Sequence, residues 1–161
     1  MAQEVTDPIG IIPEALDILA GIRNYGFIFP GSKHLDCFAI AQPQVSSRPL
    51  RYFVINGRKE RDEFKNVAAA FEGLIIVNPH LVHKDKTTKV MWKDGCMSWP
   101  YRPLKKVKRY EKIQVNYDII LDADSTFKAP SVKQIRGKQL SGLAAMVFLH
   151  ELEHLNGKSI Y

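Results

Sequence analysis

The sequence contains little cysteine and no long apolar run. Its two cysteines, Cys37 and Cys96, are too few for a disulfide framework, and in a reducing compartment both stay thiols that can bind a metal. No apolar stretch approaches the roughly 20 residues that a helix needs to cross a membrane. The N-terminal stretch has neither a basic leader segment nor a small-residue cleavage site. We therefore expect a cytoplasmic protein with no membrane segment.

The chain also lacks internal repeats, low-complexity tracts and recognisable linkers. A chain of 161 residues is long enough to bury about two thirds of its unfolded surface in one core. Its apolar fraction of 45% and charged fraction of 25% are ordinary for a globular protein. We expect a single domain, residues 1–161, that is monomeric.

A net charge of +6 and a pI near 9.3 raise the question of a nucleic-acid partner. The basic residues are spread along the chain, and the densest cluster, residues 105–109, is short. A solvated charged face explains this pattern, and no specific DNA binding is expected. Weak association with an RNA-rich surface such as the ribosome is the alternative.

A short stretch near the C-terminus, residues 150–154, has the spacing of a hydrolytic metal site. His150 and His154 are four residues apart, so they share one face of a helix and can bind the same divalent metal. Glu151 lies beside the first histidine and can take a proton from a water molecule at that metal. An exposed helix that carries two histidines and two glutamates without a metal is the alternative.

The residues before this motif predict that its helix is buried. Nearly every position from 140 to 149 is apolar, as in helices that lie inside a protein. Desolvation disfavours a charged imidazole and so favours the neutral form, which binds metals. Gly157, preceded by Asn156, predicts that the helix ends just after the second histidine.

A metal held by two histidines needs a third protein ligand, which we expect upstream. The residues after His154 read LNGKSIY and include no strong ligand. Cys96 lies between Gly95 and Pro100, whose turn chemistry favours a tightly specified position; a small core residue is the other interpretation of a lone cysteine. The upstream candidates are Cys37, Cys96, His34, His80, His83 and carboxylates.

Elsewhere, hydrophobic patterning predicts one N-terminal helix, residues 13–25, and several short strands. Residues 58–72 predict a helix or a long surface excursion. Asn56 and Gly57 predict a hairpin turn, and Asn78 with Pro79 predicts the end of a strand. The predicted strands, or strand-like segments, are 37–45, 50–55, 74–77, 89–92, 112–117 and 119–121, and residues 122–138 predict a polar connection. Short, mostly antiparallel strands packed around a central buried helix make an α+β domain.

Three stretches occur in a fixed order: CFAIAQPQ at residues 37–44, DGCMS at residues 94–98 and LHELEHLNG at residues 149–157. Together they resemble the peptide deformylase family, whose members carry G-x-G-h-A-A-P-Q, E-G-C-h-S and Q-H-E-x-D-H-h-x-G in the same order. One such match is weak, but three in register over about 120 residues are specific. The resemblance implies a metal-dependent hydrolase that removes the N-formyl group from N-formylmethionyl nascent peptides and releases formate.

The resemblance also implies a role for each site residue. Glu151 is implied as general base and acid, and the Gln44 amide and the Met97 backbone N–H as donors to the oxyanion. The implied metal ligands are Cys96, His150 and His154. These three leave a fourth position for water on one divalent ion. The resemblance implies Fe²⁺, the ligand set also suits Zn²⁺, and Ni²⁺ or Co²⁺ are substitutes.

Several positions depart from the family pattern, and two of them, Leu149 and Glu153, lie beside the histidines that they would help to orient. The full set of departures is Ala39, Gln42, Asp94, Leu149 and Glu153. With a chain that ends seven residues after His154, this divergence is similar to that of virus-encoded deformylases, which act in the host cytoplasm.

An apolar substrate pocket is expected beside the metal. Leu143, Met146 and Val147 precede His150 by seven, four and three residues and so share its side of the helix. The first motif is expected to close the pocket with Phe38 and Ala39. A narrow apolar slot suits an unbranched methionine side chain. The other interpretation is that these are ordinary core residues.

Two alternative functions remain. One is a metallopeptidase, which shares the H-E-x-x-H motif. The other is a catalytically weak homologue that keeps the metal and binds the ribosome.

Overall fold

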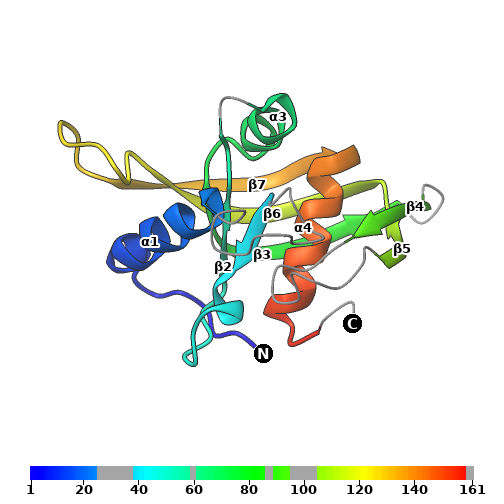
Figure 1. The fold of residues 1–161 in the computed structure, drawn as a ribbon, viewed down its shortest axis with the longest axis horizontal. Coiled ribbons are helices and arrows are strands. Elements are labelled where there is room, and N and C mark those ends of the chain that lie inside the picture. Colours follow the sequence, from blue (N-terminus) through cyan, green and yellow to red (C-terminus); the bar gives the residue numbers. More distant parts are fainter. Residues whose placement is uncertain (25–37, 59–60, 86–88, 95–104, 159–161) are drawn as a thin grey trace.

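The computed structural model describes residues 1–24, 38–58, 61–85, 89–94 and 105–158 (Figure 1). A five-stranded antiparallel sheet has the order β1-β2-β3-β6-β7, and β4 and β5 pair as a separate antiparallel ribbon. The strands are β1 (Ala39–Ala41), β2 (Tyr52–Ile55), β3 (Ile75–Lys84), β4 (Lys89–Asp94), β5 (Lys105–Tyr110), β6 (Lys112–Leu121) and β7 (Ser131–Ser141). The helices are η1 (Ile9–Ile11), α1 (Ile12–Arg23), η2 (Gln42–Gln44), α3 (Asp62–Phe71) and α4 (Gly142–Leu155). The expected α+β fold is confirmed.

The five-stranded sheet separates two hydrophobic clusters. In β2, Tyr52 and Val54 belong to the cluster on the α1 side, whereas Phe53 and Ile55 belong to the cluster on the side of α3 and α4. This alternation follows from the two-residue period of a strand. All four side chains are buried, so β2 is covered on both faces.

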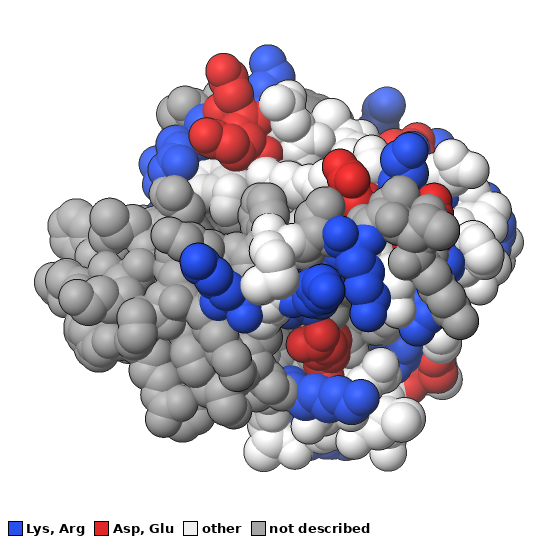
Figure 2. Space-filling model, turned by 90° about the vertical axis from the view of Figure 1, so that its right-hand side faces the viewer, with Lys and Arg blue, Asp and Glu red and all other residues white. Residues whose placement is uncertain are grey.

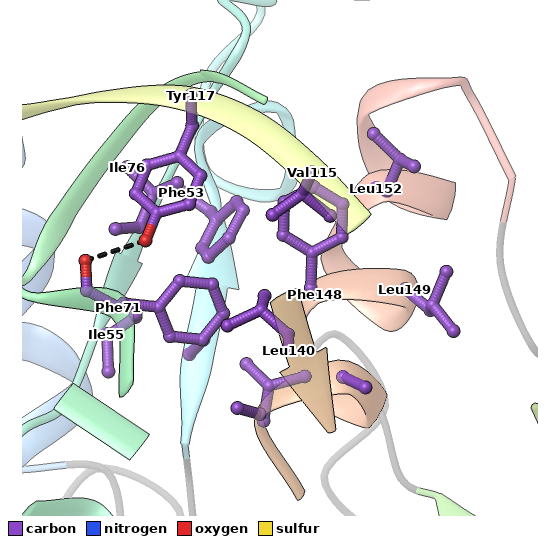
Figure 3. Packing of buried hydrophobic residues seen from close by; sticks show 14 of the residues in the cluster. Phe53, Ile55, Phe71, Ile76, Val115, Tyr117, Leu140, Phe148, Leu149 and Leu152 are labelled. Carbon is purple, nitrogen blue, oxygen red and sulfur yellow. Dashed lines mark hydrogen bonds between the residues drawn. The ribbon is translucent and has the colours of Figure 1, made fainter. Parts of the chain in front are cut away.

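Helix α4 packs on the sheet through aromatic side chains (Figure 3). The Phe148 ring centroid lies 6.1 Å from that of Phe53 and 6.3 Å from that of Phe71. The Tyr117 hydroxyl donates a hydrogen bond of 2.8 Å to the Phe71 carbonyl oxygen, drawn as the dashed line in Figure 3. Burial raises the pKa of Tyr117, which keeps the phenol neutral. Phe148 therefore fixes α4 to a rigid aromatic layer.

The predicted N-terminal helix is confirmed as α1, and α3 shows that residues 58–72 include a helix rather than only a surface excursion. Among the described residues, no helix is long and apolar enough to span a membrane. The hairpin turn predicted at Asn56 and Gly57 is wrong, because the chain continues from them towards α3. Gly57 has φ 59°, a left-handed conformation that favours glycine, and a Cβ there would also meet the end of the Leu74 side chain.

The strand predicted to end at Asn78 and Pro79 continues, because β3 runs on to Lys84. The pairing of β3 with β6 shifts register between Val77 and His80, so the two residues form an irregularity within the strand. Asn78 has φ 51°, and its side-chain Oδ1 accepts a 2.7 Å hydrogen bond from the Val5 N–H. The turn chemistry therefore anchors the N-terminal segment instead of ending the strand.

The two strands predicted between residues 112 and 121 form one strand, β6. The polar stretch 122–138 was predicted as a connection, but its last part belongs to β7. β7 is an edge strand of the sheet, and among its core-facing residues Ile135 and Leu140 are the buried ones. A mostly exposed edge strand has no regular apolar alternation to predict it.

We expect Phe148→Ala to destabilise the protein by about 3–5 kcal/mol, because it removes a fully buried ring and leaves a cavity. Phe127→Ala is the matched control, since that ring is 97% exposed, and it should change stability by about 0.5 kcal/mol or less. Denaturant unfolding monitored by circular dichroism measures both. Equal stability of the two variants would contradict this packing.

Candidate metal centre

Helix α4 begins directly where β7 ends and ends just after the second histidine of the motif. The helix ends just after the second histidine, as predicted, but its C-cap is Asn156, and Gly157, predicted as the cap, follows with φ 81°. The Gly157 N–H donates to the His154 carbonyl oxygen at 3.0 Å, and the Lys158 N–H donates to the Glu153 carbonyl oxygen at 2.8 Å. This pair of bonds is a Schellman motif, which terminates the helix through a left-handed glycine.

The two histidines of the motif converge on one point. His150 Nε2 and His154 Nε2 are 3.1 Å apart, and their ring centroids are 4.8 Å apart. Two nitrogens that each lie about 2.0–2.1 Å from a tetrahedral zinc ion are separated by roughly 3.3 Å. The donor pair therefore fits a single divalent metal.

Glu151 lies beside this point in a desolvated position. Its side chain is 5% exposed, and its Oε1 lies 3.9 Å from His150 Nε2. The His150 side chain is 10% exposed. A carboxylate at this position can reach a water molecule that shares a metal with the two imidazoles, and the low local dielectric strengthens its interaction with that ion.

An ion pair holds α4 next to the second histidine. Arg109 Nη1 donates to Glu153 Oε1 at 2.6 Å, and the Arg109 side chain is 4% exposed. The pair joins β5 to the turn of α4 that carries His154. Sequence reasoning counted Arg109 only as part of a basic cluster and missed this contact. Strand alternation was the available signal, since it separates Arg109 from its lysine neighbours.

The C-terminal end of α4 is also tied to the sheet. Arg51, 7% exposed, donates to the side-chain Oδ1 of Asn156 at 3.2 Å and to the Pro79 carbonyl oxygen at 2.8 and 3.1 Å. The Ala2 N–H donates to the Leu155 carbonyl oxygen at 2.9 Å. Because the helix end is fixed by several elements, the imidazoles are held in place before a metal binds.

Gln44 lies in η2, which packs against α4. Its side-chain Oε1 accepts a 2.8 Å hydrogen bond from the Ala41 N–H, and this contact orients the amide. Gln42, one of the departures from the family pattern, is buried and structural. Its Nε2 donates to the Arg48 carbonyl oxygen at 3.0 Å, and its Oε1 accepts from the Leu50 N–H at 2.8 Å.

Four of the five expected pocket residues share one apolar cluster: Phe38, Ala39, Leu143 and Val147. The ring of Phe38 packs edge-on against Phe64, with centroids 4.9 Å apart. Met146 is buried at 2% exposure and lies outside the cluster. These residues therefore contribute to the core, and their role in binding a substrate stays a prediction.

The remaining ligand candidates divide into two groups. His34, Cys37, Cys96 and Met97 lie outside the described residues. His80 is half exposed, with its Nε2 3.0 Å from Glu4 Oε1, and His83 is exposed. In the described part of the chain, no group of three histidine, cysteine, aspartate or glutamate residues could hold a metal. His150 and His154 are therefore two candidate ligands, and the third ligand stays a prediction.

Solved structures with the same fold are peptide deformylases. The structure has a TM-score of 0.64 to the peptide deformylase of Vibrio parahaemolyticus bacteriophage VP16T, solved with actinonin, at 22% identity over 99% of this chain and 90% of that one. The TM-score is also 0.64 to a probable peptide deformylase from Synechococcus phage S-SSM7, at 25% identity over 98% and 86% of the two chains. These likenesses define an α+β fold of the deformylase type.

The sequence profile described as polypeptide deformylase matches residues 28–161, so this chain belongs to the polypeptide deformylase family. It is 31% identical to the peptide deformylase of Thermotoga petrophila over 124 residues, which are 77% of this chain and 60% of that protein. It covers 52% of the Helicobacter pylori enzyme at 29% identity. The chain thus spans between half and two thirds of the length of these curated relatives.

We expect Cys96→Ser to lose most of the bound metal, because a neutral hydroxyl cannot replace a thiolate donor. Cys37→Ser is the matched control and should keep about one metal ion per chain. Elemental analysis of protein purified without oxygen gives the ratio. Equal metal loss in both variants would show that the third ligand is misassigned.

Proposed function

We propose that this chain is a metal-dependent hydrolase that removes the N-formyl group from N-formylmethionyl peptides and releases formate. The observation that carries the proposal is the convergence of His150 Nε2 and His154 Nε2, 3.1 Å apart, beside the desolvated carboxylate of Glu151. Membership of the polypeptide deformylase family supports the reaction class. Because the motif lies on a buried helix, its residues belong to the core and can also carry the chemistry.

The metal would be held by His150 and His154 together with Cys96. A divalent ion with these ligands lowers the pKa of a water molecule and so supplies a nucleophile near neutral pH. Two imidazoles and a thiolate suit Zn²⁺ and Fe²⁺. The 3.1 Å separation of the imidazole nitrogens is compatible with either ion at ordinary bond lengths.

Glu151 moves the proton in this proposal. Its carboxylate takes a proton from the attacking water and later gives it to the nitrogen of the departing peptide amine. The C–N bond of the formamide breaks, and formate and a free α-amino group result. Burial of the carboxylate excludes bulk water that would compete for this proton.

Gln44 stabilises the negative charge that develops on the formyl oxygen. Since the Ala41 N–H already binds Oε1, the Nε2 end of the amide is the end that donates to an oxyanion. The backbone N–H of Met97 is the second proposed donor. Two donors that bind the developing oxyanion would stabilise the transition state more than the ground state.

The test compares formyl-Met-Ala-Ser with unformylated casein, using protein purified without oxygen. Deformylation releases formate and one new amine per peptide, and it leaves casein intact. Cleavage of casein would indicate a metallopeptidase. The absence of both products from metal-loaded protein would indicate a homologue without this activity.

We expect Glu151→Gln to keep the fold and the metal while it loses about 10²–10⁴-fold in kcat, because an amide preserves size but cannot accept the proton. Glu63→Gln, at an exposed position on α3, is the control and should leave kcat unchanged. Formate release, measured with metal content, checks both. Activity of Glu151→Gln within threefold of wild type would refute the assignment of the base.

We expect the wild type to prefer formyl-Met over formyl-Ala peptides by about 1–3 kcal/mol in kcat/KM, the scale of burying a few methylene-sized groups. Leu143 is partly buried at the edge of the α4 cluster, so Leu143→Ala should narrow this preference without unfolding the protein. Leu121→Ala, 37% exposed at the end of β6, should not change it. Equal kcat/KM for the two peptides in the wild type would exclude an apolar pocket.

A further inference from the structure

The densest basic cluster of the sequence becomes strand β5, and strand alternation divides its side chains. Lys106 and Lys108 are exposed, whereas Arg109 is turned the other way and binds Glu153 on α4. The cluster is therefore not a single basic patch. One of its charges holds the metal-site helix, and the two exposed lysines face away from that helix.

The partner strand extends this exposed side. In the antiparallel register, Met91 pairs with Lys108 and Lys89 pairs with Tyr110, so these residues project to the same side of the ribbon. We call this side the outer face of the β4–β5 ribbon. Its exposed described members are Lys89, Met91, Lys106 and Lys108, and Tyr110 lies at its edge, partly buried against the core cluster.

Tyr110 lies among the charges of the outer face. The Nζ atoms of Lys84 and Lys89 lie 4.9 and 4.7 Å from its ring centroid. Desolvation raises the pKa of Tyr110, but a hydrogen bond from Lys89 and the positive charges of Lys84 and Lys89 outweigh it, so the pKa is lowered. The ring therefore lies in a positive local field.

Carboxylates do not neutralise this charge. In the described part of the chain, none of Lys84, Lys89, Lys106 and Lys108 forms an ion pair with an acidic side chain, whereas Lys133 and Lys138 on β7 both pair with Glu72, at 3.4 and 3.0 Å. Lysine and arginine gather in the middle of the molecular face that includes the ribbon end of Figure 1, with a few acidic residues between and beside them (Figure 2). An unneutralised positive surface attracts a polyanion.

We propose that the outer face of the β4–β5 ribbon is a docking surface for structured RNA. Lysines at alternate positions of a strand are about 6.6 Å apart, which suits contact with successive phosphates of a nucleic-acid backbone. Tyr110 is partly buried against the core cluster, and its ring holds the Lys84 and Lys89 ammonium groups beside this face through cation–π contacts. Among the ribbon side chains whose exposure the structure describes, which leave out Val90 and Trp92, Met91 is the one large apolar side chain that is exposed.

The position of the outer face has a consequence for the metal centre. Arg109 leaves the same strand on the opposite side and contacts α4, so RNA on the outer face does not cover the helix that carries the histidines. This inference does not rest on the proposed reaction, because it concerns binding alone.

The test measures binding of a fluorescent RNA hairpin by anisotropy at about 50 and about 200 mM salt. Lys106→Gln/Lys108→Gln should weaken binding at least about tenfold at the lower salt and reduce the slope of log K against log salt by about 1.4–1.8. Lys65→Gln/Lys128→Gln removes the same charge at exposed positions on α3 and in the β6–β7 connection, and it should stay within about twofold of wild type. Equal weakening by both pairs would overturn the proposal, since only net charge would then matter.

Two further measurements test the role of Tyr110 and distinguish an RNA partner from a membrane partner. Tyr110→Ala should weaken binding, and Tyr110→Phe should bind like the wild type, because the cation–π contacts that position Lys84 and Lys89 need the ring and not the hydroxyl. Co-sedimentation with vesicles containing phosphatidylserine tests a membrane partner. Binding to the vesicles without binding to the hairpin would overturn the proposal, and binding to the hairpin that depends on Lys106, Lys108 and Tyr110 supports it.

Discussion

The fixed position of α4 on the sheet is the constraint on which the site depends. The spacing of His150 and His154 is set within α4 itself, but the position of α4 on the sheet decides where this pair meets groups from other elements, such as Gln44 of η2. Phe148 packs the helix on the aromatic layer, and Arg109 and Arg51 hold its last turns. The contacts that stabilise the core therefore also position His150 and His154.

Three departures from the family pattern have structural explanations. Glu153, where the family has aspartate, reaches Arg109 of β5 and makes a short ion pair with an almost fully buried guanidinium. Gln42, where the family has alanine, satisfies backbone groups of the segment that follows η2. Leu149 belongs to the apolar cluster under α4. The divergent residues thus stabilise the elements that position His150 and His154.

The predictions that succeeded depend on local pattern. The buried helix, its glycine end and its pair of histidines follow from the 3.6-residue period and from the conformation that Gly157 adopts. The predictions that failed concern contacts between residues that lie far apart in the sequence. Strand β7 is defined by pairing with β6 rather than by its own apolar residues, and the Arg109–Glu153 contact spans 44 positions. Neither the period of apolar residues nor a turn signal identifies a contact partner so far away in the sequence.

The central claim is that α4 builds a site for one catalytic metal ion. The direct measurement is formate release from formyl-Met-Ala-Ser by chelator-treated protein, titrated without oxygen with Fe²⁺ and, separately, with Zn²⁺. The account predicts that no formate is released without metal, and that the rate of formate release rises with added metal and saturates at one ion per chain. Formate release that is independent of added metal, or none at any metal concentration, would contradict it.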